Sequence, residues 1–144
     1  MTENDTKTSI LYPQCTINYI GIPKTVKDAF ESALKVKNID HEICAISLRR
    51  VLEAICKDKG ASGRDLNSMV QDMIARRFLP EMFNDACWII RQLGNSAAHA
   101  DNVHFSKHQV DDTIGFVQSI INYLYILPVN MKNMISDIGA DKPH

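Results

Sequence analysis

The sequence predicts an all-α fold, a bundle of about five helices, and three observations support this prediction. Apolar residues recur at helical spacing in several stretches between residues 24 and 128. Capping signals stand in front of two such stretches, and no long run alternates apolar and polar residues. The 144 residues, 45% hydrophobic and 23% charged, have the composition of a single globular domain.

The N-terminal residues 1–23 are expected to form an extended arm that lies on the domain, because Gly21 and Pro23 oppose a helix. A first helix is expected directly after Pro23 and ends near Asn38. A second begins at Asp40, a plausible N-cap, and stops before a glycine at position 60. Both helices carry apolar residues on one face only.

The third helix is predicted to open with a capping box formed by Ser62 and Asp65. Residues 76–77, both arginines, are assigned to its last turn, where cations complement the helix dipole. Pro80 then starts a fourth helix with an apolar face of its own. A short loop or distorted turn is expected around Gly94, because glycine is a poor residue for a helix interior.

The fifth helix begins with a second capping box at residues 106–109 and is apolar on several faces. We expect it to be the central, most buried element and to end at Pro128. The predicted organisation is therefore an arm over 1–23, a helical domain over 24–128 and a tail over 129–144 with one weak helical turn.

Charge and cysteine content exclude several classes of protein. The net charge is −1, so any polyanion must bind to a local patch. No apolar run approaches the roughly 18 residues of a membrane span, and the polar N-terminus is unlike a signal peptide, which predicts a cytoplasmic protein. Cys44 and Cys56 lie on an apolar helical pattern and read as buried thiols, so neither disulfides nor cofactors are expected.

The most informative stretch contains Arg91, Asn95 and His99, each four residues from the next. If the helix persists through Gly94, the three side chains share one stripe. Arginine can hold a phosphate and histidine can transfer a proton near neutral pH, a pair that suffices for metal-free RNA cleavage. The structural alternative is that Arg91 pairs with an acid such as Asp85 or Asp101, that Asn95 caps a helix and that His99 hydrogen-bonds a neighbouring loop.

The same stripe extends backward to Asn84 and Trp88, and we group Gln92 with them as candidate interface residues. Because Trp88 lies off the apolar face of its helix, the prediction is a homodimer that buries it. The alternative is that the N-terminal arm covers Trp88. A metal site built from His99 and three neighbours at 101, 104 and 108 matches no known ligand spacing, and no metal is expected.

A family resemblance rests on four segments: Ser47-Leu-Arg-Arg-Val-Leu-Glu53, Leu66-Asn67, Ile90-Arg-Gln-Leu-Gly-Asn-Ser-Ala-Ala-His99 and Tyr123-Leu-Tyr-Ile-Leu-Pro128. They resemble the domain of unknown function 4145, which looks like a branch of the HEPN superfamily of helical domains. The resemblance covers roughly residues 24–128, and the Gly-Asn-x-Ala-Ala-His core is its most specific part.

What this resemblance implies is a HEPN-like bundle that pairs as a two-fold dimer. Many HEPN domains are metal-independent RNases whose Arg and His motifs meet across the dimer, which makes Arg91 and His99 the expected catalytic pair and Asn95 their polar helper. The implied function is an RNA endonuclease in anti-phage defence. The alternative is a non-catalytic dimerisation module that binds a protein partner in a restriction or defence complex.

Overall fold

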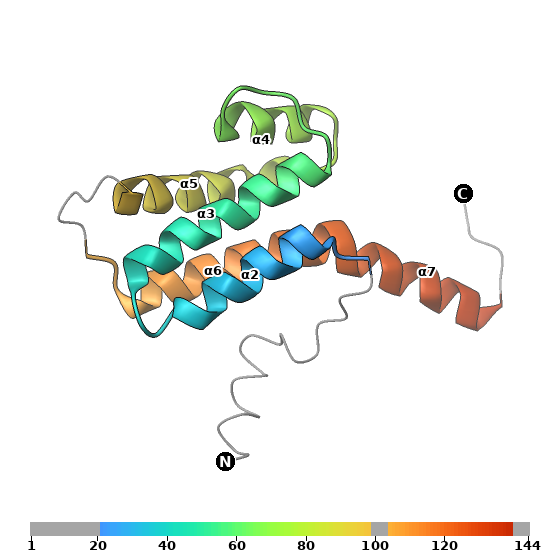
Figure 1. Ribbon diagram of the computed structural model, residues 1–144. Helices are drawn as coiled ribbons and strands as arrows, with labels where there is room; N and C mark the ends of the chain where they lie inside the picture. Colours follow the sequence, from blue (N-terminus) through green and yellow to red (C-terminus); the bar gives the residue numbers. More distant parts are fainter. Residues whose placement is uncertain (1–20, 99–103, 140–144) are drawn as a thin grey trace, which may run out of the picture.

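A computed structural model describes residues 21–98 and 104–139 of the chain. Within these residues the fold is all-α, as predicted, and no strand is formed. The helices, in chain order, are α2 (Lys24–Val36), α3 (His41–Asp58), α4 (Leu66–Ala75), the 3-10 turn η1 (Glu81–Phe83), α5 (Asn84–Ala98), α6 (Lys107–Ile121), the π-helical segment η2 (Asn122–Ile126) and α7 (Leu127–Ile138) (Figure 1). The expected N-terminal arm lies outside the described residues, except for its last three.

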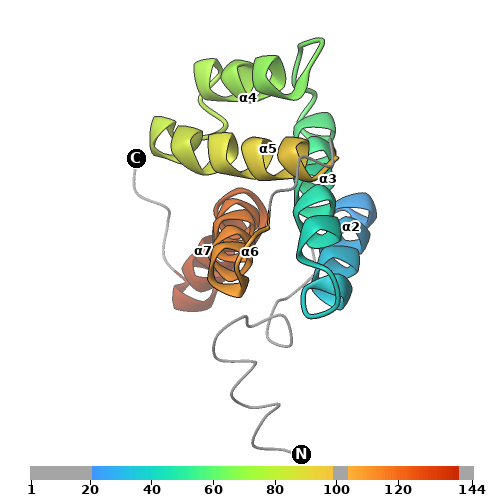
Figure 2. The same cartoon turned by 90° about the vertical axis from the view of Figure 1, so that its left-hand side faces the viewer.

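Helix α3 is the centre of the bundle. It packs against α2, α4, α5 and α6, and it buries seven residues, whereas α6 buries six. The prediction that the Ser106-capped helix is the central element is therefore wrong. That helix is apolar on several faces, but part of its apolar surface stays exposed where it continues beyond the bundle. Figure 2 shows α4 stacked on α5, and α5 in turn on α6.

The boundaries of the first two helices are confirmed. Helix α2 follows Pro23 directly, and Asp40 caps α3, because its carboxylate accepts a 2.9 Å hydrogen bond from the backbone N–H of Ile43. Two further contacts tie α3 to its neighbours. The ring nitrogen Nδ1 of His41 lies 2.9 Å from the carbonyl oxygen of Phe105, which precedes α6. The thiol of Cys44 lies 3.4 Å from the carbonyl oxygen of Ala33 in α2, as a weak donor.

The start and end of α4 differ from the prediction. Asp65 itself is the N-cap, accepting a 2.8 Å hydrogen bond from the N–H of Ser68, while Ser62 lies outside the helix and donates its N–H to Asp72. Aspartate caps a helix about as well as serine does, so Asp65 alone is the cap and the predicted capping box of Ser62 with Asp65 does not form. Residues 76–77 lie beyond the helix, whose last residue is Ala75.

Pro80 precedes the 3-10 turn η1 and is not the first residue of a long α-helix. Met82 lies in this tight turn, before α5 begins, and is 80% exposed. Helix α5 then runs without a break through Gly94 to Ala98, so the expected loop around Gly94 is not formed. Gly94 stays helical at a close crossing of α5 with α3, where the side chain of Arg49 leaves no room for a side chain at position 94.

The capping box at the start of α6 is confirmed. The Ser106 hydroxyl accepts from the N–H of Gln109 at 3.1 Å, and the Gln109 side chain accepts from the N–H of Ser106 at 3.0 Å. Pro128, however, does not end this helix, which continues through η2 and α7 to Ile138. The widened turn of η2 precedes the proline, which therefore lies in the first turn of α7, where its missing N–H costs nothing.

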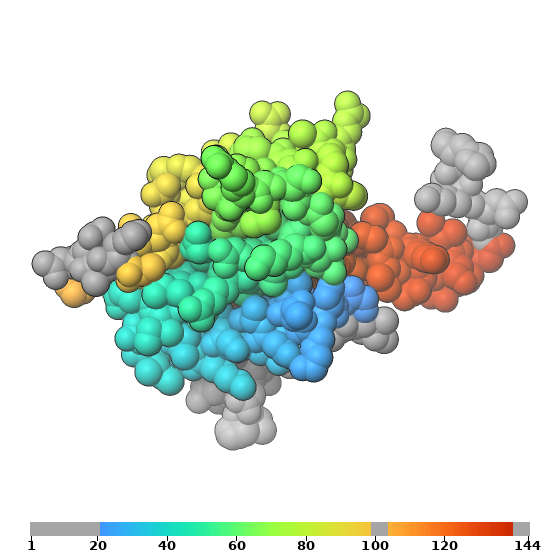
Figure 3. Space-filling view, turned by 45° about the horizontal axis from the view of Figure 1, so that its top comes forward, coloured from blue at the N-terminus to red at the C-terminus, as the bar shows by residue number. Residues whose placement is uncertain are grey.

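The continuous helix Lys107–Ile138 is long and apolar enough, by length and composition, to cross a membrane, although core helices pass the same test. Its first half, α6, belongs to the buried core. Its second half, α7, projects from the bundle, and Figure 3 shows it extending well beyond α2 and α3. Helix α7 exposes an apolar stripe along one side, formed by Leu127, Met131, Met134 and Ile138.

Candidate functional site

The polar stripe of the fourth predicted helix lies on α5. Because α5 is unbroken through Gly94, Arg91 and Asn95 stand one turn apart on the same side of the helix. The buried residues of α5 are Cys87, Ile90 and Gly94, and by helical spacing Cys87 and Gly94 lie directly beside Arg91, which therefore stands at the edge of the buried face. His99, the third predicted catalytic residue, follows the last residue of α5 in the sequence and lies outside the described residues.

Gly94 is a contact point between α5 and α3. A methyl group on its Cα would lie 2.7 Å from Cβ and 2.9 Å from Cδ of Arg49, and 3.2 Å from the carbonyl oxygen of Ala45. The two helices can approach this closely only because position 94 has no side chain. Glycine here therefore marks a tight crossing inside a helix, which explains why sequence reasoning mistook it for a break.

Arg91 is half-buried on the flank of α5 and makes no ion pair with any described residue. Its Nε atom is buried and has no hydrogen-bond acceptor among the described residues. The proposed alternative partner Asp85 is exposed and forms no ion pair there. Among the described residues, the guanidinium of Arg91 therefore has no acceptor for Nε and no ion-pair partner.

The surroundings of Arg91 include the start of α4. The pKa of Asp65 is lowered first by the hydrogen bond from the Ser68 N–H, and further by the positive charges of Arg64 and Arg91. Cys87 stands one turn before Arg91 in α5. Burial raises the pKa of its thiol to about 11, and the positive charge of Arg91 opposes this rise. Arg91 therefore lies where α4 begins against the middle of α5.

Sequence reasoning missed Arg49, which belongs to the same region. Its Nη1 donates a 2.9 Å hydrogen bond to Glu53, one turn later in α3, and its own Nε is buried without an acceptor among the described residues. Two signals in the sequence could have found it. Arg49 and Glu53 have the spacing of a helical ion pair, and a glycine within a helical pattern indicates a close approach by another element.

The three predicted interface residues extend the stripe toward the start of α5. Trp88 is 53% exposed and Gln92 is exposed, so both are available on the surface of this chain. Asn84 is half-buried, and its Oδ1 accepts a 2.9 Å hydrogen bond from Nε2 of Gln71 in α4. Asn84 is thus partly committed to the contact between α4 and α5, whereas Trp88 has no such partner in the described structure.

Metal and thiol chemistry find no support in the described residues. No group of His, Cys, Asp and Glu side chains there could hold a metal ion. Of the residues weighed for such a site, His104 is exposed, His108 pairs with Asp112 at 3.1 Å, and two lie outside the described residues. Burial raises the pKa of Cys44 to about 11 and of Cys56 to about 12, which makes both thiols poor nucleophiles at neutral pH.

Comparison with known proteins gives one match. The model of a family described as a domain of unknown function, DUF4145, matches residues 31–137, which include the second half of α2, all of α3 to α6 and nearly all of α7. No curated protein and no solved structure matches the chain.

Proposed function

The chain belongs to the DUF4145 family, and we propose that it is a metal-independent RNA endonuclease of the HEPN type. The observation that carries the proposal is the geometry of Arg91 and Asn95. They lie on one side of an unbroken helix, and Arg91 makes no ion pair with the described acids. An arginine that only stabilised the fold would be expected to have a carboxylate or carbonyl partner.

The proposed reaction is attack of an RNA 2′-hydroxyl on the adjacent phosphorus. His99 accepts the proton of that hydroxyl, and a 2′,3′-cyclic phosphate forms as the P–O5′ bond breaks. The departing 5′-oxygen takes a proton from solvent or from a second histidine. Arg91 offsets the charge that develops on the phosphate oxygens, and the Asn95 amide donates a hydrogen bond to the same group.

A homodimer forms part of the proposal, with Trp88 and Gln92 in its interface. A large aromatic side chain that is 53% exposed beside a candidate site is typical of the centre of a protein interface. In such a dimer two copies of the α5 stripe face each other, and the arginine of one chain can act with the histidine of its partner. The family resemblance is the basis on which we propose a role in defence against phage.

A second candidate function is favoured by the surface of α7. Leu127, Met131, Met134 and Ile138 recur at intervals of four, three and four residues, all exposed by 39% to 67%, on a helix that projects from the bundle. Such a stripe is suited to packing against another helix. It favours a binding module that joins a restriction or defence complex through α7.

The experiment that separates the two functions is an RNA digest in the presence of EDTA. The nuclease is expected to cleave single-stranded RNA, to leave 2′,3′-cyclic phosphate ends and to spare the same sequence as DNA, which lacks the attacking hydroxyl. An intact RNA substrate, or cleavage that EDTA abolishes, would reject the nuclease and favour the binding module.

A further inference from the structure

We propose that Arg49 of α3 is a second phosphate-binding residue beside Arg91, and that its ligand is the phosphodiester backbone of single-stranded RNA. The role rests on the function proposed above and extends it, because it assigns part of the substrate site to a helix outside the α5 stripe. Three observations carry this inference: the crossing at Gly94, the two unpartnered guanidinium nitrogens and the ion pair with Glu53.

The crossing at Gly94 places the side chain of Arg49 against α5, the helix that carries Arg91 and Asn95. Its Cβ and Cδ atoms lie against the backbone of Gly94, which is three residues after Arg91 and one before Asn95. The side chain of Arg49 thus extends over α5 at the level of the proposed site. Glycine in a helix interior costs about 1 kcal/mol relative to alanine, so this close approach is obtained at a cost in stability.

The hydrogen-bonding state of the two arginines points to a shared ligand. Among the described residues, the buried side-chain nitrogen or oxygen atoms without a partner are the Nε atoms of Arg49 and Arg91. Arg49 lies against Gly94, three residues after Arg91 on α5, and Arg91 lies near Asp65 at the start of α4. A buried N–H without an acceptor is rare. Because both Nε atoms are themselves enclosed, an RNA phosphate would contact the outer Nη groups of the two guanidinium forks. A phosphate group, with several oxygens, matches the planar donor fork of arginine.

The ion pair with Glu53 orients the guanidinium of Arg49 without using all its donors. One N–H, on Nη1, is engaged at 2.9 Å. Arginine carries five such donors; apart from this one and the buried Nε–H, three N–H groups on Nη1 and Nη2 remain for a phosphate. The pair also supports the extended side chain that crosses Gly94.

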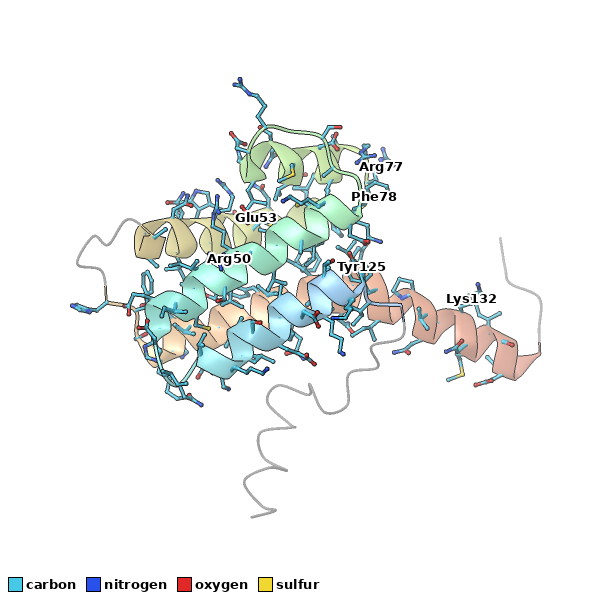
Figure 4. All side chains as sticks on the ribbon, viewed as in Figure 1. Arg50, Glu53, Arg77, Phe78, Tyr125 and Lys132 are labelled. Atoms are coloured by element: carbon cyan, nitrogen blue, oxygen red, sulfur yellow. The ribbon has the colours of Figure 1, made fainter. Side chains whose placement is uncertain are left out.

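Arg50 provides a matched control because it has the same charge on the next residue of the same helix. It is exposed, and it borders a pocket with Thr25 of α2 and with Glu53 and Lys57 of α3; Figure 4 labels Arg50 and Glu53 on this helix. General attraction of RNA to a positive charge on α3 would depend equally on both arginines. A specific phosphate site depends on Arg49 alone.

The test is equilibrium binding of a fluorescent single-stranded RNA in which every 2′-hydroxyl is methylated, so that it cannot be cleaved. Full-length protein is titrated by fluorescence anisotropy in KCl from about 50 to about 200 mM. Arg49→Met keeps the apolar stem over Gly94 and removes the donors. It is expected to weaken binding at least about tenfold and to lower the salt slope by about 0.7, whereas Arg50→Met leaves both unchanged.

Equal binding by the two variants would overturn the inference, and so would a wild type that binds no RNA. If Arg49→Met does not fold, Arg49→Lys is compared with Arg50→Lys, and equal affinities there overturn it as well. The proposed nuclease function is tested separately, by measuring whether the wild type cleaves unmodified RNA. If the wild type cleaves RNA but Arg49→Met binds it as well as Arg50→Met does, only the role of Arg49 is rejected. If Arg49→Met alone loses binding but the wild type cleaves no RNA, only the nuclease function is rejected.

Discussion

The hydroxyl of Tyr125 donates a 2.7 Å hydrogen bond to the carboxylate of Asp58, which joins the π-helical segment η2 to the end of α3. Tyr125 is 6% exposed, and the ammonium group of Lys59 lies 4.5 Å from the centre of its ring. Burial raises the pKa of this phenol, and the hydrogen bond with Asp58 raises it further. The contact fixes the point from which α7 leaves the bundle.

The Tyr125–Asp58 contact predicts that Tyr125→Phe lowers the free energy of unfolding by about 0.5 to 1.5 kcal/mol, because a part-buried hydrogen bond to the exposed Asp58 is lost while the ring stays. Tyr123→Phe is the matched control, since Tyr123 is 39% exposed and its hydroxyl has no hydrogen bond among the described residues. Urea denaturation of both variants measures the difference. Equal unfolding free energies would show that the bond with Asp58 does not stabilise the fold.

Gly94→Ala is predicted to destabilise the protein by about 1 to 3 kcal/mol, because the new methyl group meets the fixed Cβ of Arg49. Gly115 in α6 is the control. A methyl group there would meet nothing within 4 Å, so Gly115→Ala should stabilise the helix by about 0.5 to 1 kcal/mol. The sign of the change in melting temperature distinguishes the two sites, and stabilisation by both substitutions would contradict the crossing at position 94.

The helical parts of the fold were predictable because they depend on local chemistry. The cap at Asp40 and the box at Ser106 and Gln109 act within a few residues, and both were found in the sequence. The errors came from contacts between distant segments. Gly94 reads as a helix break until Arg49 is placed against it, and Pro128 reads as a stop until the π-helical segment before it is known.

The candidate site was predictable in part, for the same reason. Arg91 and Asn95 share a side of α5 through helical spacing alone, so the sequence could identify that pair. Arg49 belongs to another helix, and only the antiparallel packing of α3 on α5 brings it to the site (Figure 1). The position of His99 relative to Arg91 stays a prediction.

Stability is expected to fall at alkaline pH because of the buried thiols. The pKa of Cys44 and Cys87 is raised from 9.0 to about 11 and that of Cys56 to about 12, in each case by burial. The folded state therefore binds these protons more tightly than the unfolded state. The stabilisation is complete below the unfolded value of 9.0 and is lost as pH rises toward the folded values.

Between about pH 8 and about pH 10 the loss should be about 1 kcal/mol for each thiol, measured by urea denaturation with a reductant present. Cys56→Ala lowers stability at both pH values but is expected to reduce the loss between them. Met131→Ala, on the exposed side of α7, serves as the control with an unchanged loss. An equal loss in the wild type and in Cys56→Ala would contradict this assignment.

The proposed dimer depends on Trp88, so Trp88→Glu is expected to convert the protein to monomers. Ile39→Glu is the matched control, because Ile39 is 80% exposed in the turn between α2 and α3, away from the α5 stripe. Sedimentation velocity at micromolar concentration measures both variants and the wild type. A wild type that is monomeric, or dimers that persist in Trp88→Glu, would reject this interface.

The most direct test of the nuclease compares two histidines. His99 is the proposed general base, whereas His108 lies in the first turn of α6, exposed and paired with Asp112 at 3.1 Å. Cleavage of a single-stranded RNA is measured in EDTA under single-turnover conditions for the wild type, His99→Ala and His108→Ala, with melting temperatures recorded for all three. We expect His99→Ala to slow cleavage by about 10²- to 10⁴-fold while His108→Ala keeps the wild-type rate. Equal cleavage rates in the two variants, or no cleavage by the wild type, would contradict the assignment of the α5 stripe as an RNase site.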